Sequence, residues 1–199
     1  MKPNTIKKVL LLLLKDFSVI HTITSLANDL HLSRVGAWKV IKKLEENNFI
    51  VVRPTGSGKT NTFLLKLNWD NALAEKTLSL YLTEEALSQK RWKANFAELE
   101  GKVDFLILYG SILHFPQEAK DIDLVGVTSQ KNKFVGIQQI IDKIQKTQSK
   151  KIHSLNFTEM EFQEELLKPN KAFIEAIKKG AILFGQDNFI QFMKKIHLK

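Results

Sequence analysis

The chain has 199 residues, 44% of them hydrophobic, which is enough for one domain or for two small domains with buried cores. It contains no cysteine and no run of 18 uncharged apolar residues. Disulfides, thiolate metal sites and membrane spans are therefore not expected, and a cytoplasmic location fits. The formal net charge of +9 favours a polyanionic partner.

Residues 1–68 are predicted to form a small module of helices followed by two strands. Apolar spacing and β-rich runs place the helices at residues 5–15, 26–30 and 34–47, and the strands at residues 49–53 and 62–67. Ser33 is a suitable N-cap for the third helix. Ala37, Ile41 and Leu44 fall on one face of that helix, which should be its buried face.

The stretch SLANDLHLSRVGAWKVIKKLEENNFI resembles the winged helix-turn-helix of MarR-like regulators. The resemblance covers residues 5–68 and implies that the third helix enters the major groove of DNA with its N-terminal half. It assigns DNA contacts to that helix, its cap and the wing, at Ser33, Arg34, Gly36, Trp38, Lys39, Lys42, Lys43 and Lys59. Three alternatives stay open: the lysines could form a solvated helix face, Trp38 could pack against a neighbour, and the module could bind a protein instead.

Residues 56–60, GSGKT, resemble the end of a phosphate-binding P-loop. That motif needs a further glycine at position 53, where this chain has Arg53. It also lies between a strand and a helix, whereas this segment lies between two predicted strands. We therefore interpret residues 56–60 as the tip of the wing.

Residues 69–101 are predicted to form a helical connector, with helices over residues 70–82 and 83–99. Three leucines of this segment fall at seven-residue spacing: Leu73, Leu80 and Leu87. This spacing fits either a seam between two copies of the chain or packing between domains. A homodimer is therefore one possible assembly.

The most informative motif lies in residues 102–199, where an apolar run ends in Gly110-Ser111 and Asp121-x-Asp123 opens a second apolar run. Because alternate side chains of a strand share a face, the two aspartates should point the same way. Adjacent carboxylates repel each other unless a cation lies between them. The motif therefore predicts a site for Mg²⁺ with a bound nucleoside triphosphate.

The remaining elements of this region alternate between strands and helices. Strands are expected over residues 103–109, 122–127 and 151–158, and helices over residues 136–147, 158–167 and 173–179. A further helix beginning at Ser111 would aim its free N–H groups at a phosphate. The expected fold is a two-domain α+β or α/β protein: a winged helix, a helical connector, and a small mixed sheet with flanking helices.

The Gly-Ser and Asp-x-Asp pair resembles the nucleotidyltransferase superfamily, which includes DNA polymerase beta and the minimal nucleotidyltransferases. The resemblance covers about residues 99–189. It implies that Gly110 and Ser111 bind the phosphates of ATP or another NTP, and that Asp121 and Asp123 hold Mg²⁺. The implied reaction transfers a nucleotidyl group to a hydroxyl and releases pyrophosphate.

This chain departs from the family pattern at three places. The family commonly has a third carboxylate on the next strand, where this chain has His153, which could act as a base or be structural. The residue before the first aspartate is often serine but here is Lys120, which could pair with an aspartate or touch a phosphate. Residues 113–115, after the Gly-Ser pair, also differ.

Three functions are compatible with these patterns. The first is an enzyme that transfers nucleotidyl groups and is recruited to DNA by its winged helix. The second is a DNA-binding transcriptional regulator whose nucleotidyltransferase-like domain binds a nucleotide without turnover. The third is an antitoxin-like protein that acts on a protein partner.

Overall fold

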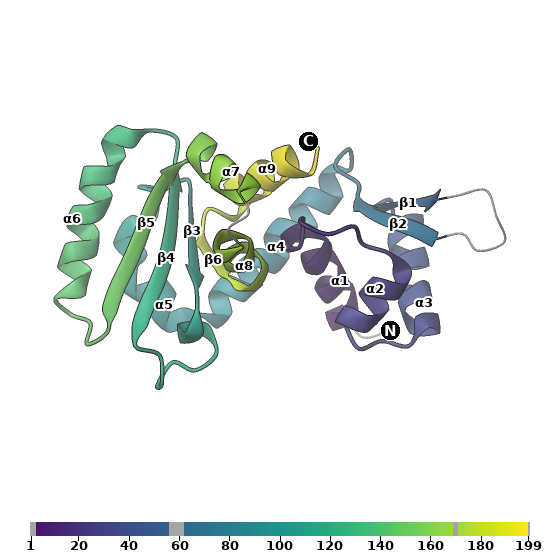
Figure 1. Cartoon of the computed structure of the whole chain (residues 1–199), viewed down its shortest axis with the longest axis horizontal. Coiled ribbons are helices and arrows are strands. Elements are labelled where there is room, and N and C mark those ends of the chain that lie inside the picture. The colour runs from purple at the N-terminus through teal and green to yellow at the C-terminus, as the bar shows by residue number, and fades with distance from the viewer. Residues whose placement is uncertain (1–2, 56–61, 169–170, 199) are drawn as a thin grey trace. The chain divides into compact units, whose positions relative to one another are not determined.

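The computed structural model describes residues 3–55, 62–168 and 171–198 (Figure 1). Within these residues the chain forms nine α-helices and two small sheets, so the expected mixture of helices and sheets is confirmed. The chain divides into two compact units, Met1–Tyr81 and Leu82–Lys199. None of the described helices is both long enough and apolar enough to cross a membrane.

The first unit consists of three helices and an antiparallel pair of strands. In chain order these are α1 Pro3–Lys15, α2 Ile23–Asp29, α3 Arg34–Glu46, β1 Ile50–Thr55 and β2 Thr62–Leu67. α2 begins three residues earlier than predicted because Thr22 and Ser25 form a capping box, in which each side chain accepts the backbone N–H of the other residue. The predicted cap of α3 is confirmed, since Ser33 Oγ accepts the N–H of Gly36 at 3.0 Å.

The third helix of this unit is amphipathic. Its buried face carries the predicted Ala37, Ile41 and Leu44, together with Val40. These side chains belong to an apolar core that α1 and α2 share. The opposite face of α3 carries mostly polar and charged residues.

The segment after the hairpin differs from the prediction. One continuous helix, α4 Ala72–Ser88, runs through Thr83, where a second helix was expected to begin. The residues after Thr83 are EEA, which favour helix, so nothing in the sequence interrupts the hydrogen-bond ladder there. The boundary between the two units lies inside α4. The next elements are α5 Lys90–Asn95 and the 3₁₀ turn η1 Ala97–Leu99.

The three leucines at seven-residue spacing all lie on α4. Leu73, Leu80 and Leu87 are 63%, 55% and 53% exposed. A helix whose apolar residues occur on both a buried and an exposed face is suited to contact a further surface. The seam between two copies of the chain stays a prediction.

The second unit is built on a four-stranded mixed sheet with the strand order β5-β4-β3-β6. Its strands are β3 Phe105–Tyr109, β4 Asp121–Thr128, β5 Lys151–Thr158 and β6 Ala181–Phe184. β3 is antiparallel to both of its neighbours, whereas β4 and β5 are parallel and are joined through α6 Phe134–Gln145. The expected small mixed sheet is confirmed in this form.

Helices cover both faces of this sheet (Figure 1). On one face, Ile137 and Ile141 of α6 belong to the same apolar cluster as Ile122 and Leu124 of β4. The helices on the other side are α7 Glu159–Leu167, α8 Ala172–Lys179 and α9 Gln186–His197. Because Ile122 points toward α6, the flanking Asp121 and Asp123 lie on the opposite face.

The helix α7 starts with a capping box that gives a testable pH dependence. Thr158 Oγ1 accepts the N–H of Glu161, and Glu161 Oε2 accepts the N–H of Thr158 at 2.9 Å. An ion pair with Lys131, followed by the hydrogen bonds that the N–H and the hydroxyl of Thr158 donate to the carboxylate, lowers the pKa of Glu161 from 4.5 to about 2. Ionised Glu161 therefore stabilises the fold above pH 4.5, and this stabilisation is lost as the pH falls toward 2.

We accordingly expect Glu161→Gln to be less stable than the wild type at pH 7, with a difference that shrinks steadily between pH 4.5 and pH 2. Urea unfolding at several pH values measures this difference. Glu164→Gln is the matched control on the same helix, and its difference from the wild type should be small throughout. A Glu161→Gln difference that stays constant down to pH 2 would contradict the capping role of the carboxylate.

Candidate metal and nucleotide site

The three predicted site residues Asp121, Asp123 and His153 come together on one face of the sheet. Parallel pairing of β4 with β5 places His153 directly opposite Asp123. His153 Nδ1 lies 3.5 Å from Asp123 Oδ1 and 3.7 Å from Asp121 Oδ2. One ligand atom from each of the three residues lies within 4.8 Å of the others, which is close enough for all three to bind one metal ion.

Asp123 is a residue of this cluster whose pKa is shifted. Its pKa is raised, first by partial burial and second by the charge of Asp121, while the nearby His153 acts in the opposite direction. Its side chain is 24% exposed, compared with 36% for Asp121 and 46% for His153. A divalent cation between the carboxylates would remove their repulsion, so the donor set fits a bound metal ion.

Gly110 makes room for this cluster at the end of β3. A Cβ atom built on Gly110 would lie 2.5 Å from Asp123 Oδ2, and the residue has φ 85° and ψ −167°. That backbone conformation is almost restricted to glycine. The Asp123 carboxylate therefore packs against bare backbone and occupies the space that a side chain at position 110 would fill.

The prediction of a helix beginning at Ser111 is wrong. Ser111–Leu113 form only a single 3₁₀ turn, η2, and no side chain caps it. The reason lies in Phe115-Pro116, because a residue before proline disfavours helical backbone and proline cannot continue the hydrogen-bond ladder. The assignment of phosphate binding to Gly110 and Ser111 thus depends on the turn alone, without the dipole of a regular helix.

Two residues at the site were missed by the sequence reasoning. Tyr109 pairs with Asp123 across β3 and β4, and its pKa is raised by burial and by the charges of Asp123 and Asp121. Lys151 pairs with Asp121 across β4 and β5 and is exposed. Their position in the strands was predictable, but their neighbours were not, because strand pairing is a long-range property.

Lysines at the start of β4 and β5 have different surroundings. Lys120 is exposed beside Asp121, at the position where the nucleotidyltransferase family often has serine. Lys150 Nζ donates to the carbonyl oxygens of Gln117 and Ala119. Lys150 therefore fixes the loop that leads into the aspartates, whereas Lys120 is accessible to an anionic ligand.

The predicted DNA-binding residues other than Lys59 lie on or directly before α3. Four cations of this helix are exposed, namely Arg34, Lys39, Lys42 and Lys43. Ser33 and Gly36 are joined by the capping bond, so they shape the start of the helix. Lys59 lies outside the described residues.

Trp38 packs against a neighbouring ring, as one of its two alternatives predicted, and its contact with DNA stays a prediction. It is 36% exposed, and its ring packs against Phe63 of β2 with a centroid distance of 5.5 Å. Together with Arg34 and Val35 it lines a pocket of about 420 Å³ beside α3. Val35 is 66% exposed, so the predicted DNA-reading face contains apolar as well as cationic side chains.

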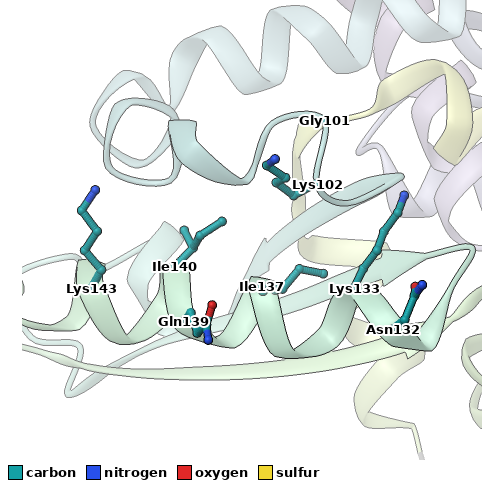
Figure 2. Close-up of a pocket in the computed structure, with 9 residues that line it drawn as sticks. Gly101, Lys102, Asn132, Lys133, Ile137, Gln139, Ile140 and Lys143 are labelled. Atoms are coloured by element: carbon teal, nitrogen blue, oxygen red, sulfur yellow. The ribbon is translucent and has the colours of Figure 1, made fainter.

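A separate pocket of about 640 Å³ lies against α6. Figure 2 shows Lys133, the residue before α6, and Lys143 near the end of α6, with Ile137 and Ile140 between them on the side of the helix that faces Gly101 and Lys102. The cluster of Asp121, Asp123 and His153 is not part of this pocket, because it lies on the sheet face away from α6.

Comparisons with protein-family models, curated proteins and solved structures give no match for this chain. Function has to be inferred from the chemistry of the site, since a fold alone does not specify an activity. The resemblances to MarR-like winged helices and to nucleotidyltransferases stay predictions.

The close approach of Gly110 to Asp123 gives a direct test of the site geometry. We expect Gly110→Ala to destabilise the protein by about 1–3 kcal/mol, because alanine is strained in this backbone conformation and its Cβ would displace the carboxylate. Thermal or urea unfolding measures the loss. Gly136→Ala is the matched control, since a Cβ there meets nothing within 4 Å and should stabilise α6 by roughly 0.5–1 kcal/mol. Equal stability of the two variants would show that Gly110 is not constrained.

Proposed function

We propose that this protein is a metal-dependent nucleotidyltransferase whose residues 102–199 carry the active site and whose residues 1–68 bind DNA. The observation that carries the proposal is the juxtaposition of Asp121, Asp123 and His153 beside the Gly110 turn. Two carboxylates on one strand and a third donor on the next strand suit a metal ion with a bound triphosphate, and the glycine turn places bare backbone beside them. No other cluster of three or more metal-ligating side chains is found among the described residues.

In the proposed reaction, different residues would bind the metal ion and the nucleotide. Asp121 and Asp123 hold a divalent cation such as Mg²⁺, which would neutralise the charge of the triphosphate of ATP or another NTP. Gly110 lets the phosphates approach the backbone, and Lys120 or Lys151 contacts them from the strand ends. The acceptor hydroxyl oxygen would bond to the α-phosphorus as the bond to pyrophosphate breaks, and the hydroxyl proton would pass to solvent water.

The proposal is tested by incubating the purified protein with α-labelled NTPs, a divalent metal ion and candidate acceptors. The acceptors should include DNA, RNA and protein hydroxyls. Label that becomes covalently attached to an acceptor, with release of pyrophosphate, supports the enzyme. If the protein binds NTP but transfers nothing to any acceptor, the regulator becomes the better proposal.

A DNA-binding transcriptional regulator is the second candidate, and the cationic face of α3 favours it. In this case the nucleotide would act as a signal, because His153 replaces the carboxylate that commonly completes the acidic triad. An antitoxin-like role with a protein partner is the third. The exposed Val35 and the Trp38–Phe63 pair favour that role, since they offer apolar area next to α3.

The DNA-binding proposal predicts a specific salt dependence. We expect the double variant Arg34→Ala, Lys39→Ala to bind DNA more weakly, and its plot of log K against log salt to be less steep by about 0.9 for each phosphate that the protein no longer neutralises. Fluorescence anisotropy between about 50 and 200 mM salt measures both quantities. Lys8→Ala removes an exposed cation from α1 and should leave the slope unchanged. An unchanged slope in the double variant would contradict the assignment of α3 as the helix that contacts DNA.

A further inference from the structure

We infer that His153 is a metal ligand, and that it makes this site select a first-row transition-metal ion such as Mn²⁺, Co²⁺ or Zn²⁺ over Mg²⁺. This inference depends on the proposed function, because it names the ion for the site proposed there. It concerns metal identity, which neither the Asp-x-Asp motif nor the carboxylate pair determines.

The first step is the position of the imidazole. Parallel pairing places His153 opposite Asp123, and the atom that faces the carboxylates is Nδ1. Its distances of 3.5 Å and 3.7 Å to the aspartate oxygens are longer than a normal hydrogen bond. Two atoms that each lie about 2.1 Å from one metal ion are separated by about 3.0 to 3.4 Å for octahedral and tetrahedral angles. His153 Nδ1 is thus within a few tenths of an ångström of the donor spacing to each aspartate, and all three donor atoms lie within 4.8 Å of one another.

The second step is the accessibility of the donors. His153 and Asp121 are 46% and 36% exposed, so a hydrated ion can reach them and keep open positions for water or a nucleotide. Charged or titratable groups near the cluster include Tyr109 of β3, Lys151 of β5 and Lys120, which precedes Asp121. The pKa of Tyr109 is raised from a usual value already far above 7, so the phenol is neutral, and the two lysines add positive charge beside Asp121. None of the three supplies a third carboxylate.

The third step is the chemistry of the donor set. Mg²⁺ prefers oxygen ligands and loses its water reluctantly, whereas imidazole suits the transition-metal ions. Replacing a third carboxylate by a neutral imidazole also reduces the negative charge of the site from −3 to −2. This reduction weakens the binding of a hard cation such as Mg²⁺ more than that of a transition-metal ion. A site of two carboxylates and one imidazole therefore gains affinity for an ion that accepts nitrogen.

One rival arrangement uses the same contacts. A protonated His153 would lie between the aspartates as an internal cation and would compete with any metal ion. In that case removing the imidazole would leave metal binding unchanged or make it stronger. The two arrangements therefore predict opposite effects of His153→Ala.

The experiment titrates Mn²⁺ into the full-length protein by electron paramagnetic resonance, followed by competition with Mg²⁺ and with Zn²⁺. The variants are His153→Ala, His153→Asp and Asp123→Asn, each checked for folding by circular dichroism. We expect His153→Ala to weaken Mn²⁺ binding at least about tenfold, the lower end of the loss seen for groups that only support a metal ligand. We expect His153→Asp, which completes an acidic triad, to shift the preference toward Mg²⁺ by about tenfold or more relative to Zn²⁺.

The outcomes separate this inference from the proposed function. Metal binding that is lost in Asp123→Asn but is equal in wild type, His153→Ala and His153→Asp would overturn the inference and leave the proposed site standing. Stronger binding in His153→Ala would overturn it in favour of the internal cation. Absence of any divalent-metal binding in the wild type would contradict both the inference about His153 and the proposed metal-dependent function. Because the readout is metal affinity, none of these results requires an active enzyme or a known acceptor.

Discussion

Replacing Asp123 or Asp121 with asparagine should lower the rate of nucleotidyl transfer by at least about a thousandfold. Asparagine keeps the shape of the side chain but removes the negative charge on which metal binding depends. Asp123 should show the larger loss, because it is the more buried of the two aspartates, is paired with His153 and lies against the Gly110 backbone. The measurement is the initial rate of label transfer from the best NTP at saturating metal.

Asp142→Asn is the control for this experiment. Asp142 is an exposed carboxylate on α6 that accepts a hydrogen bond from Gln138, and asparagine can still accept that bond. Transfer at the wild-type rate in this variant would exclude a general effect of lost charge in the second unit. Transfer at the wild-type rate in both Asp121→Asn and Asp123→Asn would place the chemistry elsewhere in the molecule.

Stability provides an independent readout for Asp123. Because burial and Asp121 raise its pKa in the folded protein, ionised Asp123 destabilises the metal-free fold above its usual pKa. Asp123→Asn should therefore raise the melting temperature in EDTA at pH 7, and the gain should disappear below about pH 4. A residue that costs stability and is required for activity behaves as a functional residue rather than a structural one.

The sequence predicted the local part of this architecture well, because helix and strand patterns depend on neighbouring residues. Alternation along one strand was enough to place Asp121 and Asp123 on the same face, and Ser33 was recognisable as a cap. The failures are also local in origin. Pro116 prevents the helix expected at Ser111, and the strong helix formers after Thr83 prevent the expected break there.

The composition of the site was harder to predict, because it depends on strand pairing. Which strand lies beside β4, and in which register, cannot be read from spacing alone, since a shift of one residue would turn His153 to the other face. Tyr109 and Lys151 were missed for this reason. The need for glycine at position 110 is likewise a tertiary effect, because it arises from the approach of Asp123 on a neighbouring strand.

The largest stability effect should come from the aromatic cluster that attaches α7 and α9 to the sheet. Phe162 is fully buried, and its ring lies 5.5 Å from Phe192, 5.6 Å from Phe157 and 6.3 Å from Phe105, measured between centroids. We expect Phe162→Ala to lower the free energy of unfolding by about 3–5 kcal/mol, because it removes a buried ring and leaves a cavity among rigid neighbours. Domains of this size are stable by about 5–15 kcal/mol, so the loss is a large part of the total.

Urea unfolding measures this loss, and Phe115→Ala is its matched control. Phe115 is 61% exposed, so the same chemical change there should cost no more than about 0.5 kcal/mol. Phe162→Leu should fall between the two, since it keeps apolar volume but loses the ring contacts. Similar losses for Phe162→Ala and Phe115→Ala would mean that α7 is not held to the sheet by this cluster. Metal affinity in the folded fraction of Phe162→Ala should be retained, because the register of β4 with β3 and β5 positions Asp121, Asp123 and His153.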